Sequence, residues 1–150
     1  MTTKFQMETY GQLRKEAEAL TLAEEHFDEV APGSVPLCLN HQQFEWMDAN
    51  NVLHIVTARD EGKLVGYHFT ICKTHLHRNV LAGYVDAFYI SPEHRNGRVG
   101  MRLMQYAEDT LKRRGVQWIY SGSKHVKDVG RLMEHLGYAP IETVYLKVIA

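Results

Sequence analysis

The hydrophobic pattern of residues 83–104, GYVDAFYISPEHRNGRVGMRLM, changes from the period of a strand to the period of a helix. Residues 83–90 alternate, which predicts a strand with Val85, Ala87 and Tyr89 on one face and Asp86, Phe88 and Ile90 on the other. A polar turn containing Asn96 and Gly97 follows, and from Val99 the apolar residues recur at helical spacing. The stretch therefore predicts a strand, a polar turn and a helix that continues to residue 114.

The first half of the chain alternates between helical and strand periods. Its pattern predicts, in order, a strand at 4–9, an amphipathic helix at 11–30 and a short helix at 41–49. Ala31-Pro32-Gly33 is expected to end the long helix. Two strands, 52–58 and 64–72, are expected to form an antiparallel hairpin, because Gly62 between them suits a tight turn.

The second half predicts a strand at 116–121, a helix from Lys127 or Asp128 to Leu136, and one or two closing strands within 138–149. The element order is a helical part, a hairpin, and then strand, helix, strand, helix, strand. This order predicts one α/β (α+β) domain over residues 1–150, built on a mixed sheet.

Composition excludes several classes of protein. Lysine and arginine number 17 against 18 acidic residues, a formal charge of −1, which argues against a general nucleic-acid binder or membrane-surface protein. No apolar run approaches the ~20 residues of a spanning helix. Cys38 and Cys72 give neither a disulfide framework nor a metal spacing, and His75 and His77 lack a nearby ligand partner. We therefore expect a cytoplasmic protein without a bound metal.

The turn before residue 99 has the features of a phosphate-binding site. The first turn of a helix has free N–H groups and a partial positive charge, and Gly97 and Gly100 let an anion approach the backbone. Arg95, Arg98 and Arg102 add positive charge. We expect this turn to bind a phosphorylated ligand.

The sequence of residues 90–100, ISPEHRNGRVG, resembles the acyl-CoA pyrophosphate loop of the GNAT superfamily of N-acyltransferases. Arg95 and Gly100 match the ends of the usual pattern, whereas Arg98 stands where its inner glycine is expected. Residues 132–138, LMEHLGY, resemble a second segment of the superfamily, located before the last strands. The likeness extends from about residue 52 to the C-terminus.

The resemblance implies a fold and a reaction. The fold is a mixed, mainly antiparallel sheet flanked by helices. The reaction is transfer of an acetyl group from acetyl-CoA to a primary amine, by direct attack in a ternary complex and without a metal. The implied cofactor-binding residues are Phe88, Tyr89, Ile90, Arg95, Asn96, Gly97, Arg98, Val99, Gly100 and Met101.

Two residues are candidates for proton transfer. Asp86 lies where GNAT strands carry an acid and is the favoured base, although it could instead hydrogen-bond a neighbouring loop. The usual tyrosine that protonates the leaving thiolate is Met133 here. His125 is the favoured substitute because its ordinary pKa of ~6.5 suits proton transfer at neutral pH. The alternatives are Ser123, Tyr120 and Tyr145, or an exposed His125 without a role.

The acceptor amine is not identified by the sequence. Glu25 and Glu29, one helical turn apart, and His75 are candidate acceptor-binding residues, although the two glutamates could simply form a solvated face. The acceptor could be a small molecule or a protein amine. GNAT-like domains often pair through their last strands, so a homodimer is one option, and the sequence leaves the oligomeric state open. Its place would be the cytoplasm, or the host cytoplasm if a phage encodes the chain.

Two other functions remain open. A catalytically inactive GNAT-like module that binds CoA or a protein would explain Arg98 and Met133. A nucleic-acid-binding domain whose arginines contact phosphates is a weaker alternative, which predicts steeply salt-dependent affinity.

Overall fold

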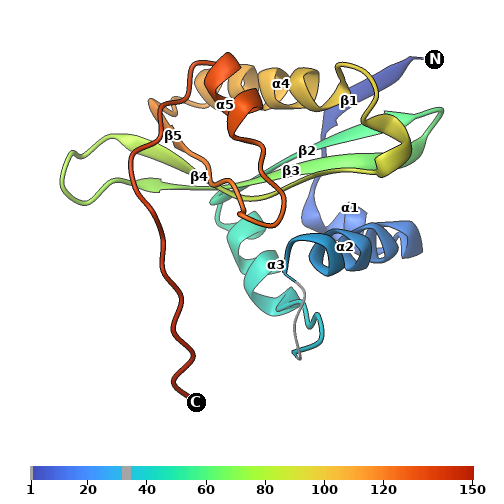
Figure 1. The fold of residues 1–150 in the computed structure, drawn as a ribbon, viewed down its shortest axis with the longest axis horizontal. Helices are drawn as coiled ribbons and strands as arrows, with labels where there is room; N and C mark the ends of the chain where they lie inside the picture. Colours follow the sequence, from blue (N-terminus) through green and yellow to red (C-terminus); the bar gives the residue numbers. More distant parts are fainter. Residues whose placement is uncertain (1, 32–34) are drawn as a thin grey trace.

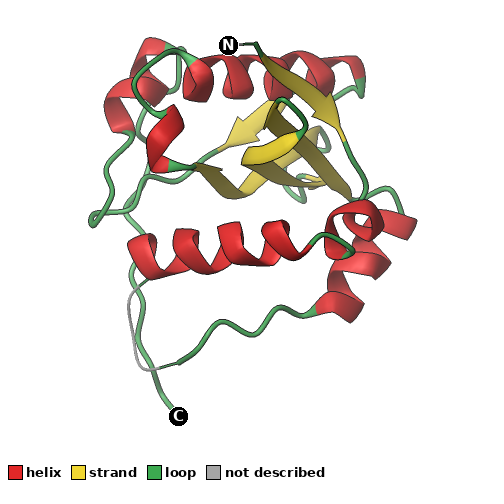
Figure 2. Ribbon diagram, turned by 90° about the vertical axis from the view of Figure 1, so that its right-hand side faces the viewer, coloured by secondary structure: helices red, strands yellow, loops and turns green. Residues whose placement is uncertain are grey.

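A five-stranded sheet lies between two layers of helices in the computed structural model, which describes residues 2–31 and 35–150 (Figures 1 and 2). The strands are β1 (Thr3–Met7), β2 (Leu53–Asp60), β3 (Lys63–Thr74), β4 (Leu81–Ile90) and β5 (Trp118–Tyr120). They lie in chain order, β1 to β4 pair antiparallel, and β4 pairs with β5 in parallel. The predicted mixed, mainly antiparallel sheet is confirmed.

The helices divide between the two faces of this sheet (Figure 1). One face carries α1 (Tyr10–Arg14), α2 (Ala17–Val30) and α3 (His41–Ala49), and the other carries α4 (Val99–Arg113) and α5 (Gly130–His135). Each layer has its own core. Leu13, Leu22 and Met47 pack on the first face against Ile55 and Tyr67, while Leu103 and Ala107 of α4 pack on the second against Val56, Val65 and Ile90.

The predicted hairpin is confirmed, with longer strands than expected. Its turn contains Glu61 and Gly62 at φ values of 50° and 85°, the left-handed conformation that a two-residue hairpin turn requires. This turn extends β2 and β3 toward the loop that follows β4. A single turn of 3-10 helix, Pro92–His94, then leads through residues 95–98 into α4.

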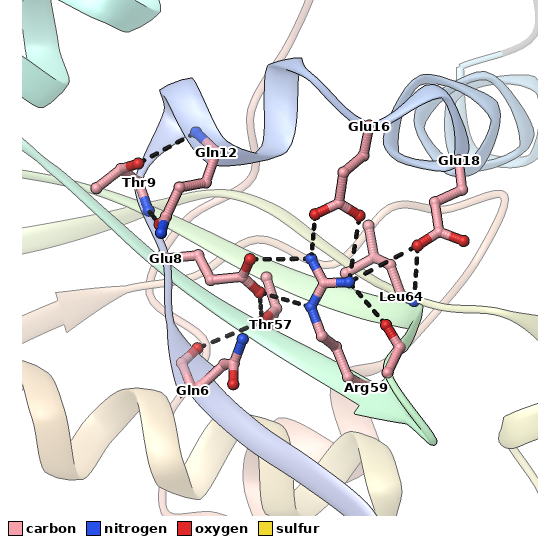
Figure 3. Close-up of polar contacts among 10 residues, drawn as sticks. Gln6, Glu8, Thr9, Gln12, Glu16, Glu18, Thr57, Arg59 and Leu64 are labelled. Atoms are coloured by element: carbon pink, nitrogen blue, oxygen red, sulfur yellow. Dashed lines mark hydrogen bonds and ion pairs between the residues drawn. The ribbon is translucent and has the colours of Figure 1, made fainter.

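The prediction of one helix over residues 11–30 is wrong, because the chain breaks into α1 and α2 at Lys15 and Glu16. Glu16 has an extended backbone (φ −95°, ψ 119°) that places its carboxylate 2.6 and 3.2 Å from the Arg59 guanidinium. Glu8 binds the same guanidinium through two contacts of 2.9 Å, and Glu18 lies 3.7 Å away (Figure 3). Arg59 thus joins β1 and α2 to β2, and the break in the helix supplies one of its partners.

The long helix ends at the residue that the sequence predicts. The helix α2 ends at Val30. The expected stop signal at Pro32 and Gly33, and Ser34 after it, lie outside the described residues.

The predicted alternation along β4 is wrong before Ala87. Phe69 of β3 pairs with Ala87, but the next residue, Thr70, pairs with Val85. Asp86 is therefore an extra residue without a partner on β3, a β-bulge that shifts the faces of all preceding residues. The bulge lies in the middle of the strand that carries the candidate base.

The prediction of closing strands within residues 138–149 is also wrong. Residues 138–150 form no strand and extend away from the body of the protein (Figure 1). We call residues 139–150 the C-terminal arm. A strand needs a backbone partner, and the arm leaves the turn at Gly137 (φ 93°) without pairing with β5, which itself has only three residues. The most exposed large apolar side chains of the arm are Tyr145, Leu146 and Ile149.

The helices of the described chain are all too short or too polar to span a bilayer.

Candidate active site

A cleft of about 580 Å³ opens between the end of β4, the start of α4 and the helix α5. We call it the α4 cleft. Most of the predicted cofactor-binding residues line it, namely Phe88, Tyr89, Ile90, Arg95, Gly97, Arg98, Gly100 and Met101. Asn96 and Val99 are not among the lining residues: Asn96 is exposed, and Val99 packs against the core beneath α4.

The start of α4 is suited to an anion. The helix has 15 residues, and its first turn contains no acidic side chain. Its N-cap, Arg98, gives no side-chain hydrogen bond to the helix, so that the first N–H groups of α4 remain available to a ligand. Arg98 has φ −98°, which any residue adopts, and the loop therefore accepts arginine where the GNAT pattern has glycine.

The two glycines of the turn leave space for a ligand. A Cβ atom added to Gly97 would meet nothing within 4 Å, and one added to Gly100 would lie 3.6 Å from the Phe88 ring. The backbone of this turn is thus open on the side of the α4 cleft.

Arg95 is held by three groups at the edge of the cleft. Its Nη1 and Nη2 donate to the two carboxylate oxygens of Glu29 at 3.0 and 2.8 Å, and its Nε donates to the Ile90 carbonyl oxygen at 2.8 Å. The guanidinium lies 5.1 Å from the centre of the Tyr89 ring. The hydrogen bond from Arg95 lowers the pKa of Glu29, and the same bond raises the pKa of Arg95. Both groups are therefore charged at neutral pH.

The edge of β4 that faces the α4 cleft is free of a neighbouring strand. β5 pairs with β4 only from Ala82 to Tyr84, so residues 85–90 have no strand on that side within the described chain. The Ser91 N–H donates to the Val65 carbonyl, and antiparallel residues alternate in direction. The backbone groups of Phe88 and Ile90 consequently point to the open edge, as the contact from Arg95 to the Ile90 carbonyl confirms.

A second, larger space of about 1640 Å³ lies beside β4 and β5. We call it the β5 hollow. The α4 cleft and the β5 hollow share four lining residues, so the two spaces adjoin each other. The shared residues are Val30, Phe88, Lys127 and Val129. A long ligand whose anionic end lies at α4 can therefore extend along the open edge of β4 into the hollow.

Asp86 faces the β5 hollow from the bulge in β4. Its side chain has access to solvent, but the surrounding protein raises the pKa of its carboxyl group through burial. His26 of α2 lines the same hollow, and its Nδ1 atom lies 2.6 Å from the Tyr67 hydroxyl. The structure therefore places the candidate base beside a buried, polar pair that the sequence did not indicate.

The candidates for the leaving-group acid differ in their surroundings. His125 is exposed in the loop that borders the β5 hollow, and Tyr120 lines the hollow with its ring stacked on Tyr84 at 5.0 Å. Ser123 also lines the hollow, but its hydroxyl is bonded to Asp128 at 2.8 Å. Tyr145 lies on the exposed C-terminal arm. Met133, at the position of the usual tyrosine, is buried against the hollow.

The structure separates the three candidate acceptor-binding residues. Glu29 lies in the α4 cleft, where it binds Arg95, rather than in the β5 hollow. Glu25 is exposed on α2. His75 lies near the far end of the sheet, where its ring is 5.4 Å from that of Trp118 and 6.2 Å from that of Tyr120.

Leu132 and His135 are lining residues that were not predicted as cofactor contacts. They come from α5, which folds over the start of α4 beside Lys127 of the preceding loop. Leu132 and His135 fall within the LMEHLGY segment, so the only signal for them was the resemblance of that segment. Nothing in local spacing indicates which side chains of α5 face the cleft. The described residues include no group of three or more histidine, cysteine or acidic side chains arranged to hold a metal.

Comparisons with known proteins identify the family of this chain. The family model described as Acetyltransferase (GNAT) family matches residues 20–138. A search of curated protein sequences gives no match.

Solved structures show the same fold at low sequence identity. A ribosomal-protein-alanine N-acetyltransferase from Brucella melitensis biovar Abortus 2308 is similar with a TM-score of 0.76 and 19% identity, over 99% of this chain and 100% of that chain. An aminoglycoside acetyltransferase from an uncultured soil metagenomic sample, in complex with sisomicin, has a TM-score of 0.76 and 15% identity, over 99% and 96%. A predicted acetyltransferase with acetyl-CoA from Clostridium acetobutylicum has a TM-score of 0.71 and 12% identity, over 99% and 96%. With the family match over most of the chain, these likenesses show that the chain belongs to the GNAT family of acetyltransferases.

Proposed function

We propose that this acetyltransferase moves the acetyl group of acetyl-CoA to a primary amine, by direct attack of the amine within a ternary complex. The observation that carries the proposal is that the α4 cleft and the β5 hollow adjoin along the open edge of β4. One substrate can enter from α4 and the other from the hollow, so that their reacting atoms meet beside Phe88 and Asp86.

The residues of the α4 cleft fit acyl-CoA. Its pyrophosphate would lie at the start of α4, where backbone N–H groups, the helix dipole and the nearby arginines favour an anion. Lys127 and His135 add donors on the opposite wall. The pantetheine arm would follow the open edge of β4, where the Phe88 and Ile90 backbone groups are free to pair with its amides.

The free N–H of Phe88 would stabilise the transition state. The amine nitrogen attacks the thioester carbonyl carbon, and the carbonyl oxygen becomes an oxyanion that this N–H can bind. Collapse of the tetrahedral intermediate breaks the C–S bond and releases CoA as a thiolate. The backbone direction along β4 favours Phe88 over Tyr89 as the donor, because the Tyr89 groups face β3.

Asp86 would take the proton that the attacking amine loses, either directly or through water. Its raised pKa makes it a stronger base than an ordinary aspartate, and it faces the hollow where the amine would lie. His125 would return a proton to the thiolate, since it lies on the same hollow and Met133 cannot donate one.

The enzyme itself would form no covalent intermediate. Burial raises the pKa of the Cys72 thiol, which makes it a poor nucleophile at neutral pH, and Cys38 is exposed outside both spaces.

The acceptor would be a cationic amine. The β5 hollow is lined by four carboxylates and three lysines, so acidic groups outnumber basic ones and would attract a protonated amine before it loses its proton. The carboxylates belong to Asp86, Glu108, Glu134 and Glu142, and the lysines are Lys112, Lys124 and Lys127. The hollow is wide enough for a small molecule or for the end of a peptide. Related folds include one protein named for a ribosomal-protein alanine and one in complex with an aminoglycoside, so both classes belong in a screen.

The functional unit would be a homodimer that acts in the cytoplasm. The C-terminal arm exposes six large apolar side chains, and the outer edge of β5 has no partner strand in the described chain. A second copy of the chain can cover both features by adding its arm beside β5.

The test of the proposed reaction is release of free CoA thiol, measured with acetyl-CoA and a panel of polyamines, aminoglycosides and peptides with free N-termini. Release that depends on one class of amine, with the acetylated amine identified by mass spectrometry, supports the proposal. Acetyl-CoA binding without product for every amine would favour the inactive CoA-binding module, for which the absence of a tyrosine at Met133 is the supporting observation.

A further inference from the structure

Glu29 and Arg95 join two parts of the protein that the proposed reaction must coordinate. Glu29 belongs to the last turn of α2, on the face of the sheet that carries the N-terminal helices. Arg95 belongs to the turn before α4, at the edge of the α4 cleft. Their two parallel contacts of 3.0 and 2.8 Å form the fork geometry that makes an arginine–carboxylate pair directional.

Every nitrogen of the Arg95 guanidinium has a protein partner. Two nitrogens donate to Glu29 and the third to the Ile90 carbonyl, while the guanidinium carbon lies over the Tyr89 ring. Arg95 therefore holds the turn against the end of β4. Without Glu29, only the single contact to Ile90 and the stacking on Tyr89 would fix the direction of this side chain.

The same turn of α2 also borders the second space. His26, one turn before Glu29, lines the β5 hollow and stacks on Tyr89 at 4.7 Å, and Val30 lines both the hollow and the cleft. Lys127, which also lines both spaces, lies 3.7 Å from a Glu29 carboxylate oxygen. Glu29 thus makes ionic contacts with two cations on opposite walls of the α4 cleft.

We propose that Glu29 is a positioning residue for the acyl-CoA site, which holds Arg95 against β4 and so fixes the turn that would bind the pyrophosphate. This inference rests on the proposed function and replaces the sequence-based hypothesis that Glu29 binds the acceptor. The inference predicts that neutralising Glu29 weakens acetyl-CoA binding, whereas charge repulsion alone predicts the opposite change in affinity. A carboxylate beside a phosphate site repels the ligand, so its neutralisation alone should tighten binding. Loss of the Arg95 geometry should weaken it.

The experiment compares Glu29→Gln with the parent protein and with Asp28→Asn. Asp28 is an exposed carboxylate of the same helix, next to Glu29 in sequence, so the two variants remove the same charge. Calorimetric titration with acetyl-CoA should give a dissociation constant about five- to tenfold higher for Glu29→Gln and unchanged for Asp28→Asn. Glu29→Asp, which keeps the charge on a shorter side chain, should restore part of the affinity. Equal thermal midpoints would separate this effect from loss of folding.

A second variant keeps the test independent of any one substitution. Arg95→Lys keeps the positive charge but loses the fork, so it should weaken binding and make Glu29→Gln harmless in the double variant. In turnover assays, Glu29→Gln should raise the KM for acetyl-CoA and leave the KM for the amine unchanged.

Three results would overturn the inference in distinguishable ways. Absence of acetyl-CoA binding by the folded parent would overturn it together with the proposed function. Equal or tighter binding by Glu29→Gln would overturn the positioning role alone. A raised KM for the amine with unchanged acetyl-CoA affinity would show that Glu29 binds the acceptor amine instead.

Discussion

The Nδ1 atom of His26 lies 2.6 Å from the Tyr67 hydroxyl, a hydrogen bond that joins α2 to β3 within the core beside the β5 hollow. Burial lowers the pKa of His26 to about 4 and raises the pKa of Tyr67. Both groups are neutral at physiological pH. His26, kept neutral in this pair, can therefore line a space that receives a cationic amine without repelling it.

Acid should destabilise the protein through its buried histidines. Burial lowers the pKa of His26, His54 and His68 to about 4 each. The unfolded chain binds protons on these groups below pH ~6.5, whereas the folded chain does not until about pH 4. The stability that the neutral histidines provide is thus complete above pH 6.5 and is lost as the pH falls through this window.

Urea unfolding at pH values from 7.5 to 4.5 measures this loss. The midpoint should fall steeply below pH 6.5, and His54→Gln should flatten the curve by removing one of the three protons. His77→Gln is the matched control because His77 is exposed. A midpoint that stays constant between pH 6.5 and 5 would show that the histidines do not control stability.

Arg59→Met should be the most destabilising loss of a single cation. The Arg59 side chain is only 12% exposed and that of its most buried acidic partner, Glu8, only 7%, so the substitution leaves carboxylates without a counter-charge in a partly buried site. Hydrogen bonds from Arg59 lower the pKa of Glu8 against the opposing effect of burial. We expect a loss of about 3–5 kcal/mol in the free energy of unfolding.

The control for this prediction is Arg14→Met. Arg14 pairs with Glu45 at the surface, where both side chains are about half exposed, and its loss should change the free energy by about 0–1 kcal/mol. Chemical denaturation of both variants gives the comparison. Similar losses of unfolding free energy in the two variants would show that the contacts of Arg59 in Figure 3 stabilise the protein no more than a surface ion pair does.

Asp86→Asn should slow turnover without weakening acetyl-CoA binding. Loss of a general base typically costs about 10²–10⁴ in rate, while the α4 cleft does not include this residue. In the parent, kcat/KM should fall as the pH drops through the raised pKa of Asp86, since only the carboxylate accepts a proton. A variant with parental kcat would instead assign Asp86 to a hydrogen bond that supports a neighbouring loop.

Removal of the C-terminal arm should convert the proposed dimer to a monomer. Deletion of residues 141–150 removes the exposed apolar side chains of the arm and leaves Tyr138 beside Glu108 in place. Sedimentation velocity should then give the mass of one chain, with Leu146→Asp weakening association in the full chain. A parent that is monomeric at micromolar concentration would contradict the dimer and imply that the arm folds back on its own chain.

The sequence was sufficient for the features that depend on local pattern. The hairpin follows from alternating residues around Gly62, and α4 follows from the helical spacing after Val99. The turn between β4 and α4 could be predicted as an anion site because glycine and arginine act there through the backbone and through charge.

Features that depend on distant partners could not be predicted in this way. The break before α2 exists because Glu16 reaches Arg59, which lies 43 residues later in the chain. The bulge at Asp86 depends on the register with β3, and the role of Glu29 depends on where the turn at Arg95 folds back. The arm has the alternation of a strand, but periodicity does not show whether a partner edge lies within reach.

The most direct test of the central claim is a calorimetric titration of the protein with acetyl-CoA, beside Gly100→Glu and Gly100→Gln. An added side chain at Gly100 enters the α4 cleft near Phe88, and glutamate brings a negative charge to the start of α4. We expect micromolar binding by the parent, weaker binding by Gly100→Gln and no detectable binding by folded Gly100→Glu. No binding by the folded parent, or equal binding by Gly100→Glu, would contradict an acyl-CoA site at this turn.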